Sequence, residues 1–426
     1  MDEYEQSSPA ALPESAPLVT LGALRRGLAS VMTIHDNEVL RPPDEVIVFR
    51  GQVQGDTEAA FAHIEPAFAS LGYTAWLRDR TGGGHEVLAI KGLARARPPR
   101  PWLNLVLFLA TVVTVLYIGA GYALTDAGLA ENLAPEQALW LPLRYLALGV
   151  PFAATLLGIL LAHELSHYFV SRRYGAPTSL PYFIPMPNLL GTMGAVIVQR
   201  GHMRSRRAIF DIGIAGPLGG LVVAIPLLVV GLSLSSVGPI PPNVDTVLQE
   251  GNSLLYLGLK YLVFRQILPQ NGIDVWLHPV AFAAWAGLLV TMINLIPVGQ
   301  LDGGHVAYAL LGPRAARLGQ VLILAMVLWG GYLSLRGDQG GGFWLMWGVL
   351  NLFLNRRHPA PLDDATKADG KRVLVGVLML ALFVLLFMPS PLKQIEVRPG
   401  AGPAAWGGLA ALGCLLALRR RTTRLT

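Results

Sequence analysis

Two histidines and a glutamate interrupt an apolar stretch of the chain that runs from Leu143 to Tyr174. His163 and His167 are four residues apart, so on a helix they lie on one face and can hold one metal ion together. Glu164 stands beside them, where its carboxylate can take a proton from a metal-activated water molecule. The pattern H-E-x-x-H therefore predicts a hydrolytic metal centre on this helix.

The composition indicates that this centre lies in a membrane. The chain is 53% hydrophobic and 14% charged, with a mean hydropathy of +0.49, whereas soluble domains carry about 25% charged residues. An ionisable side chain inside a bilayer costs roughly 2.5–3.5 kcal/mol on insertion scales. Three such groups within five residues need a partner, and a metal ion satisfies all of them.

Cysteine and charge exclude two other classes of protein. Cys414 is the single cysteine, so a C-x-x-C metal site and a disulfide framework are excluded, and the metal ligands must be histidine and carboxylate. The formal net charge is +6, but the basic residues cluster at the ends of apolar runs. This clustering is typical of an orientation signal in a membrane rather than of a nucleic-acid surface.

A third ligand is expected from an acid in apolar surroundings, because two histidines leave a zinc site incomplete. Asp302 is the leading candidate, since it follows the fourth apolar run by a few residues and should lie at the depth of His167. Asp211, at the start of the third run, is the competitor. Asn294 precedes the helix break at Pro297 and is a candidate donor to the oxyanion that forms when water attacks a peptide carbonyl.

The hydropathy pattern predicts an all-α polytopic membrane protein with about seven or eight spans and a small N-terminal α+β soluble module. Seven runs are expected to cross: 102–124, 143–174, 208–234, 278–297, 318–335, 341–354 and 373–388, with 404–418 a marginal eighth. The segment 176–201 is apolar but rich in proline and glycine. It is expected to form a re-entrant loop or hairpin next to the metal, with Gly191 and Gly194 at the bends.

The predicted domains follow from these runs. They are a disordered or short-helix segment (1–44), a β-α-β-β module (45–93), a basic proline-rich linker (94–101), the membrane domain that carries the metal centre (102–389) and a C-terminal tail with a short apolar segment (390–426). Arginines and lysines near the span ends place the N-terminal module in the cytoplasm. The chain is therefore expected to be a multi-pass membrane protein, of the cell membrane if it is bacterial.

Four motifs together carry a family resemblance: HELSH, GTMGAVI, AGPLGG and NLIPVGQLDGG. Over roughly Leu143 to Gly312 the chain resembles the site-2 protease family of intramembrane zinc metalloproteases. The soluble N-terminal module and the sequence around the HELSH motif are similar to the branch that includes the plastid ethylene-dependent gravitropism-deficient proteases and their bacterial relatives.

The resemblance implies His163, His167 and Asp302 as zinc ligands, Glu164 as general base and Asn294 as an aid to the transition state. It also implies that the segment from Gly191 to Gly194 seats an unwound substrate. The expected reaction is hydrolysis of peptide bonds within or near transmembrane segments of other proteins. The expected partners are such a substrate, the lipid bilayer, an upstream protease and a regulator at the N-terminal module, and no nucleic acid.

Two other functions compete with this interpretation. A catalytically silent scaffold would keep the metal for stability, but it would not need Glu164. A metal transporter would need polar residues along several spans, whereas here they gather at one depth. The remaining candidate histidines are expected at surfaces or interfaces; they are His202, His278, His305 and His358. Of these, His305 is the strongest alternative ligand, because it is three residues from Asp302.

Overall fold

The computed structural model describes residues 16–40, 46–92, 100–129, 135–239, 246–354 and 358–396. The chain divides into two compact units, and each is described by itself. The first contains residues up to Ala96 together with Gly201–Arg207 and Pro359–Lys367, and the second contains the rest. The marginal run at 404–418 and the linker segment 93–99 lie outside the described residues.

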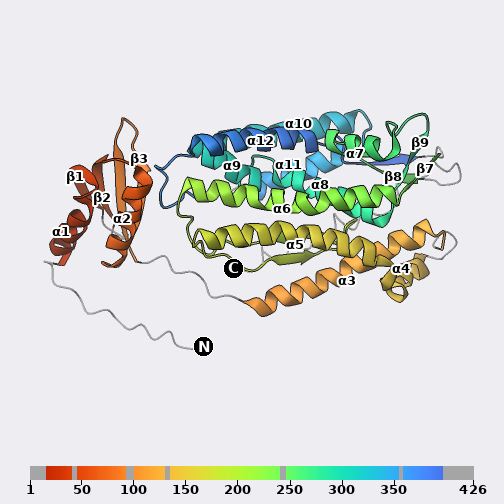
Figure 1. The fold of residues 1–426 in the computed structure, drawn as a ribbon, viewed down its shortest axis with the longest axis horizontal. Coiled ribbons are helices and arrows are strands. Elements are labelled where there is room, and N and C mark those ends of the chain that lie inside the picture. The colour runs from red at the N-terminus through yellow and green to blue at the C-terminus, as the bar shows by residue number, and fades with distance from the viewer. Residues whose placement is uncertain are drawn as a thin grey trace, which may run out of the picture. The chain divides into compact units, whose positions relative to one another are not determined.

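The first unit is an antiparallel sheet with strand order β1-β2-β4-β3 and two helices (Figure 1). Its elements are α1 (Ala16–Leu28), β1 (Met32–Leu40), β2 (Val46–Val53), α2 (Thr57–Ala69), β3 (Tyr73–Asp79) and β4 (His85–Lys91). Aromatic side chains of β2 and α2 fill the core, with Phe49, Phe61 and Phe68 at most 1% exposed. The apolar face of α2 and the alternation of the strands therefore produce this layer.

The first strand of this unit differs from the sequence prediction. The expectation of a disordered or short-helix segment over 1–44 is wrong for Met32–Leu40, which forms strand β1. Arg50 on β2 holds this strand through ion pairs to Asp36 and Glu38. Its sequence lacks clear alternation because the strand lies at the edge of the sheet and most of its residues are not buried.

Segments from two loops much later in the chain complete the same unit. Leu77 on edge strand β3 donates a backbone hydrogen bond to Leu362 and accepts one from Asp364. Met203 in turn accepts a backbone hydrogen bond from Leu362. The segment 362–364 thus covers the edge of the sheet, whose free backbone groups would otherwise need solvent.

The second unit is built from apolar helices. They are α3 (Pro101–Asp126), α4 (Pro135–Arg144), α5 (Val150–Arg173), α6 (Arg206–Ser233), α7 (Leu254–Phe264), α8 (Pro279–Asn294), α9 (Asp302–Leu311), α10 (Ala315–Leu335), α11 (Gly340–Leu354) and α12 (Gly370–Leu386). Short 3₁₀ turns at Leu146–Gly149 and Gly312–Arg314 lead into α5 and α10. Figure 1 shows the long helices running side by side.

Within the described ranges, four helical segments are long and apolar enough to cross a membrane: Pro101–Asp126, Leu146–Arg173, Arg206–Ser233 and Asp302–Leu335. Helices α8, α11 and α12 lie at three of the other expected runs and contain 16, 15 and 17 residues. These lengths fall below the roughly 20 residues of a typical span. The protein is therefore an integral membrane protein by its long helices, and the count of seven or eight spans stays a prediction.

The prediction of an all-α membrane part is wrong in one respect, because the described portion of this part contains three two-stranded antiparallel sheets. Strands β5 (Tyr182–Pro185) and β6 (Thr192–Val196) form a hairpin within the segment expected to be a re-entrant loop or hairpin. Beyond the other ends of the helices, β7 (Ser236–Pro239) pairs with β9 (Ile273–Trp276), and β8 (Thr246–Glu250) pairs with β10 (Leu392–Glu396). These strands are too short for a period-2 pattern to be recognised in the sequence.

Helices α5 and α8 pack closely, and this contact positions the site. A Cβ atom at Gly287 of α8 would lie 2.9 Å from the Ile159 side chain of α5, so the glycine lets the two helices approach. The turn after α8 is equally tight. A Cβ at Gly303 would lie 2.0 Å from the carbonyl oxygen of Leu295, so only glycine lets α9 begin directly over this turn.

Candidate metal centre

The two histidines of α5 converge on one point. Nε2 of His163 lies 3.1 Å from Nε2 of His167, and both residues are at most 5% exposed. The i, i+4 spacing places both rings on one face of the helix, as the sequence predicts.

Asp302, the first residue of α9, completes a cluster of three groups that could hold a metal ion. Its Oδ2 atom lies 3.1 Å from Nε2 of His163, and its Oδ1 atom lies 3.2 Å from Nε2 of His167. A zinc ion with ligands at 2.0–2.1 Å in a tetrahedron separates its ligand atoms by about 3.3 Å. The distances among the three residues therefore fit a tetrahedral ion with one position open.

The hydrogen bonding of these residues also fits a metal. Nδ1 of His167 lies 2.7 Å from the carbonyl oxygen of Ile212 on α6. A carbonyl only accepts, so Nδ1 carries the proton and Nε2 keeps its lone pair toward the cluster. Oδ2 of Asp302 is buried, and its contact at 3.1 Å with Nε2 of His163 does not have the geometry of a hydrogen bond. A buried carboxylate oxygen without a donor is costly, and a cation at this point removes the cost.

Glu164 and Asn294 flank the cluster. Oε1 of Glu164 lies 4.0 Å from Nε2 of His163, and α5, the helix that carries this carboxylate, contacts β6. Asn294 ends α8, and its Nδ2 atom lies 3.4 Å from Nε2 of His163. The structure thus brings together all five residues that the sequence analysis singled out.

A glycine face of α6 forms one wall of the site. A Cβ atom at Gly216 would lie 2.0 Å from Nε2 of His167, and one at Gly220 would lie 3.4 Å from His163. A Cβ at Gly213 would lie 2.8 Å from Cβ of His305 on α9. Glycines at this density in a span predict close approach of a neighbouring helix, but they do not identify that helix as the one that carries the histidines. The three- and four-residue spacing of glycines in AGPLGG was the available signal, because it places them on one helix face.

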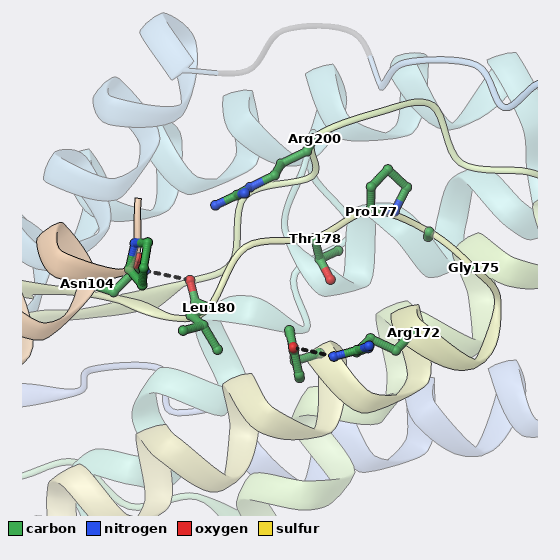
Figure 2. A pocket seen from close by; sticks show the side chains of 10 residues that line it. Asn104, Arg172, Gly175, Pro177, Thr178, Leu180 and Arg200 are labelled. Atoms are coloured by element: carbon green, nitrogen blue, oxygen red, sulfur yellow. Dashed lines mark hydrogen bonds between the residues drawn. The ribbon is translucent and has the colours of Figure 1, made fainter. Parts of the chain in front are cut away.

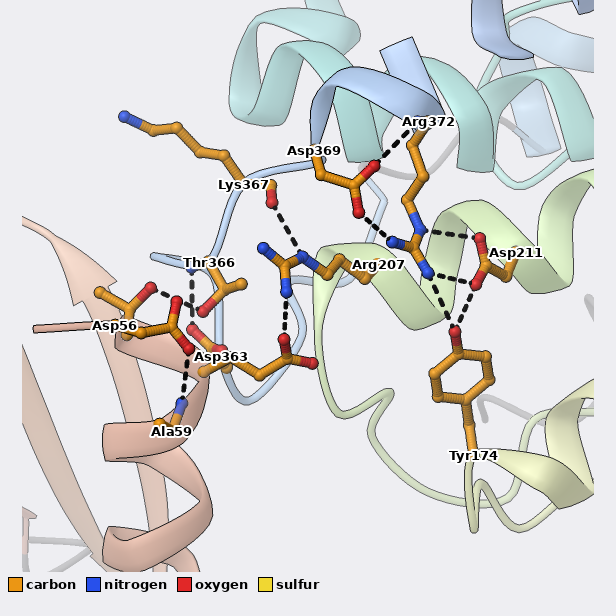
Figure 3. A network of polar contacts seen from close by, with 12 residues as sticks. Asp56, Ala59, Tyr174, Arg207, Asp211, Asp363, Thr366, Lys367, Asp369 and Arg372 are labelled. Atoms are coloured by element: carbon orange, nitrogen blue, oxygen red, sulfur yellow. Dashed lines mark hydrogen bonds and ion pairs between the residues drawn. The ribbon is translucent and has the colours of Figure 1, made fainter. Parts of the chain in front are cut away.

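The competitor Asp211 lies in a different network (Figure 3). Both of its carboxylate oxygens accept hydrogen bonds from Arg372, at 2.6 and 2.8 Å, and Tyr174 also donates to it. This bidentate pair already satisfies the carboxylate. Asp211 therefore belongs to a structural ion pair between α6 and α12.

The other candidate histidines have their own contacts. His202 stacks edge-on against Trp76, with 4.8 Å between ring centres, and His278 accepts a hydrogen bond from Val280 at the start of α8. Nδ1 of His305 lies 2.6 Å from Nε2 of His358. Among the described residues, the metal-type cluster contains none of these four.

The hairpin β5-β6 is held against α3. Gly191 has a φ of +75°, and its carbonyl accepts a hydrogen bond of 2.7 Å from the Thr114 hydroxyl. A Cβ at Gly191 would lie 2.7 Å from the carbonyl oxygen of Thr114, so a larger residue does not fit. Gly194 within β6 has a φ of +100° and open space beside it. The bends are thus where the sequence predicts them, and they bring β6 next to Glu164.

Residues 151–335, which contain every group of the cluster, match the model of peptidase family M50. This part of the chain is thus similar to an M50 peptidase domain. The resemblance to site-2 proteases and to their plastid branch is thereby confirmed.

Curated proteins that are similar to this chain carry consistent names. The chain is 29% identical over 382 residues to "Probable zinc metalloprotease EGY1, chloroplastic" of Arabidopsis thaliana, covering 81% of this chain and 66% of the relative. It is 33% identical over 245 residues to "Probable zinc metalloprotease EGY2, chloroplastic" of the same plant, covering 57% and 42%. It is 29% identical over 378 residues to "Probable zinc metalloprotease EGY1, chloroplastic" of Oryza sativa subsp. japonica, covering 81% of this chain and 63% of the relative.

The chain thus spans between 42% and 66% of the lengths of these relatives. Their names describe zinc metalloproteases, and the cluster of His163, His167 and Asp302 supplies ligands that suit zinc. The relatives' names and the ligand set of the cluster agree, so zinc is the metal that this site binds.

Proposed function

We propose that the protein is an intramembrane zinc metalloprotease that hydrolyses peptide bonds within or near transmembrane segments of other proteins. The observation that carries this proposal is the convergence of His163, His167 and Asp302 beside Glu164, all at most 8% exposed and within an apolar helical unit. A structural metal site has no use for the adjacent carboxylate, whereas hydrolysis needs one.

In this proposal His163, His167 and Asp302 hold zinc, which when bound polarises a water molecule and lowers its pKa. Glu164 takes a proton from that water as it attacks the peptide carbonyl. The amide of Asn294 donates a hydrogen bond to the oxygen on which negative charge develops. Glu164 then delivers the proton to the leaving amine. The bond between His167 Nδ1 and the Ile212 carbonyl fixes the ring during these steps.

An unwound substrate is expected to lie along β6. Strand addition to a free sheet edge satisfies the substrate's backbone, which a helix would otherwise keep to itself. The pairing of β6 with β5 in a two-stranded sheet supports this position, and so does the contact of β6 with α5, the helix that carries Glu164. The open space beside Gly194 supports it as well.

The site is expected to open toward the cytoplasm. Basic residues mark one end of the helices, with Arg172 and Arg173 ending α5, and Lys371 and Arg372 starting α12. Such residues stay on the cytoplasmic side. His167 is six residues before the end of α5, which corresponds to about 9 Å of helix below the surface. The N-terminal unit would then be cytoplasmic, where it could bind a regulator. In the same proposal an upstream protease first trims the substrate.

The test compares Glu164→Gln with the parent chain in proteoliposomes that contain a fluorescent single-span reporter. The expected result is unchanged zinc content and loss of cleavage, because glutamine keeps the shape and loses the base. Restored cleavage in the variant would exclude Glu164 as the base. If the parent contains zinc but peptide mass spectrometry detects no cleavage of any membrane protein by it, the result would favour a silent scaffold instead.

A further inference from the structure

A cavity of about 550 Å³ lies away from the metal cluster, at the basic end of α5. Its wall contains Asn104 of α3, Tyr168 and Arg172 of α5, and Thr178, Leu180 and Arg200 from the segments that flank the β5-β6 hairpin. Figure 2 shows Arg172 and Arg200 on opposite sides with Thr178 between them. This volume falls within the range of small-molecule sites, which is about 300–1,000 Å³.

The charge of the cavity has one sign. Two arginines line it, and none of the described lining residues is an aspartate or glutamate. Guanidinium groups present several N–H donors in a plane that matches the oxygens of phosphate or carboxylate. The lining therefore suits an anion.

Arg172 is exposed, and a contact with Tyr168 on its own helix orients its guanidinium group. Its Nη1 donates to the Tyr168 hydroxyl at 2.9 Å, and its guanidinium carbon lies 5.7 Å from the centre of that ring. One N–H is thereby used to aim the group, and others remain to meet a ligand. A cation at the end of α5 would by itself be explained by the helix dipole, but this orientation would not.

A ladder of backbone bonds fixes the opposite side. Arg200 donates from its backbone N–H to Pro177 at 2.7 Å, and Ser179 donates to Val198 at 3.0 Å. Asn104, only 6% exposed, donates from Nδ2 to the carbonyls of Leu180 and Pro181 at 2.8 and 2.9 Å. Hydrogen bonds thus hold the wall of the cavity in place and connect α3 to the segments that flank the β5-β6 hairpin.

One hydroxyl of this frame lacks a partner. Oγ1 of Thr178 is buried and has no hydrogen-bond partner among the described residues. Buried hydroxyl groups are normally paired, because an unpaired one costs free energy. Thr178 lies between the two arginines, so an oxygen of a bound anion would satisfy it.

The cavity also lies where a membrane places phosphate. It is formed where the span Pro101–Asp126 begins and the span Leu146–Arg173 ends. Leu180 in its wall is 43% exposed, and Trp102 beside Pro101 is 64% exposed, which is typical of side chains at the lipid–water boundary. Lipid phosphates are concentrated at this depth.

We infer that this cavity binds a phosphate ester group, carried by an anionic lipid head or by a soluble molecule. The charge, the unpartnered hydroxyl and the interfacial position each point to it independently. The lipid source is favoured by the exposed apolar residues at the rim, which could contact an acyl chain.

The test uses the full-length protein in detergent, with native mass spectrometry after titration of short-chain phosphatidylglycerol, short-chain phosphatidylcholine or inorganic phosphate. The expected result is saturable binding of one phosphatidylglycerol per chain. Arg172→Gln and Arg200→Gln should each weaken it about tenfold or more, because a hydrogen-bonded charge is lost. Arg173→Gln is the matched control: it removes the neighbouring charge, which does not line the cavity, and should leave binding unchanged.

A second variant keeps the test decisive if an arginine variant folds poorly. Thr178→Val preserves the shape and removes the unpaired hydroxyl, so it should weaken phosphatidylglycerol binding without lowering the melting temperature. If inorganic phosphate binds with the same dependence on both arginines, the source is a soluble phosphate and the site stands. Binding that is equal in all variants, or absent for every phosphate probe, overturns the inference.

Discussion

The backbone of Gly216 lies directly against the ring of His167: a Cβ atom built on this glycine would be 2.0 Å from the histidine's Nε2 atom. Nε2 is also the atom that faces His163 and Asp302. The absence of a side chain at Gly216 therefore leaves room for the His167 ring at the metal cluster. This contact links the AGPLGG motif to the HELSH motif through shape alone.

We expect Gly216→Ala to lower the zinc content of the purified protein strongly, because the new methyl group must displace His167 from the cluster. Gly158→Ala is the control, since this glycine is on the same helix as the histidines and a Cβ there meets nothing within 4 Å. Zinc per chain is measured by elemental mass spectrometry. Full zinc content in Gly216→Ala would show that α6 moves away at little cost.

The two aspartates that competed for the third ligand position should respond differently to substitution. Asp302→Ala is expected to weaken zinc affinity at least about 100-fold, since even loss of a partner behind a ligand costs 10–100-fold. Asp211→Asn should retain zinc, because its carboxylate is engaged by Arg372. It should instead lower the free energy of unfolding by about 1.5–3 kcal/mol, as loss of a charged hydrogen bond does.

Competition with a zinc chelator, followed by chemical denaturation of each variant, separates these two effects. Loss of zinc from Asp211→Asn with Asp302→Ala unaffected would reverse the assignment of the ligand.

Asn294→Ala should reduce kcat by about 10²–10³-fold with zinc content unchanged, because one donor to the oxyanion is removed. The buried Asn351 on α11, which donates to the Trp347 carbonyl, provides the control Asn351→Ala. Steady-state kinetics on the reporter decide the matter. A rise in KM with kcat preserved would assign Asn294 to substrate binding rather than to the transition state.

Local geometry explains which parts of the site the sequence could predict. The i, i+4 spacing of His163 and His167 fixes their common face whatever the tertiary structure. The choice between Asp302 and Asp211 could only be ranked by depth, because it depends on Arg372, which is 161 residues from Asp211. Side-chain partners at such separation leave no periodic signal in one sequence.

The first unit shows the same division. The alternation of β2, β3 and β4 and the apolar face of α2 could be recognised in the sequence. Strand β1 and the segment at 362–364 could not, because they join the sheet through backbone hydrogen bonds, which any sequence can make. An edge strand with few buried residues has no hydrophobic pattern to recognise.

One carboxyl group in the first unit predicts a pH dependence of its stability. Asp363 is 1% exposed, and burial raises its pKa from 3.8 to about 6. It accepts a backbone hydrogen bond from Thr366 at 3.0 Å (Figure 3), while its Oδ2 atom has no partner among the described residues. The ionised form is thus disfavoured in the folded unit.

The sign follows from the direction of this shift. The folded state binds the proton more tightly than the unfolded state, so folding is favoured at low pH and loses stability as pH rises from about 4 through about 6. Above that range both states are ionised, and the contribution of Asp363 is constant. In Asp363→Asn the side chain cannot ionise, so this loss should be absent and the variant should be more stable than the parent at neutral pH.

Hydrogen exchange of peptides from β3 and β4, corrected for the intrinsic effect of pH on exchange, measures the free energy of opening in the full-length protein. The parent should lose protection between about pH 4 and 6, and Asp363→Asn should not. Asp56→Asn is the control: it keeps a side chain that can cap α2 and leaves Asp363 in place, so it should retain the parent's profile. A parent profile that is flat across this range would mean that water or a cation reaches the Asp363 carboxylate and removes the cost of burying its charge.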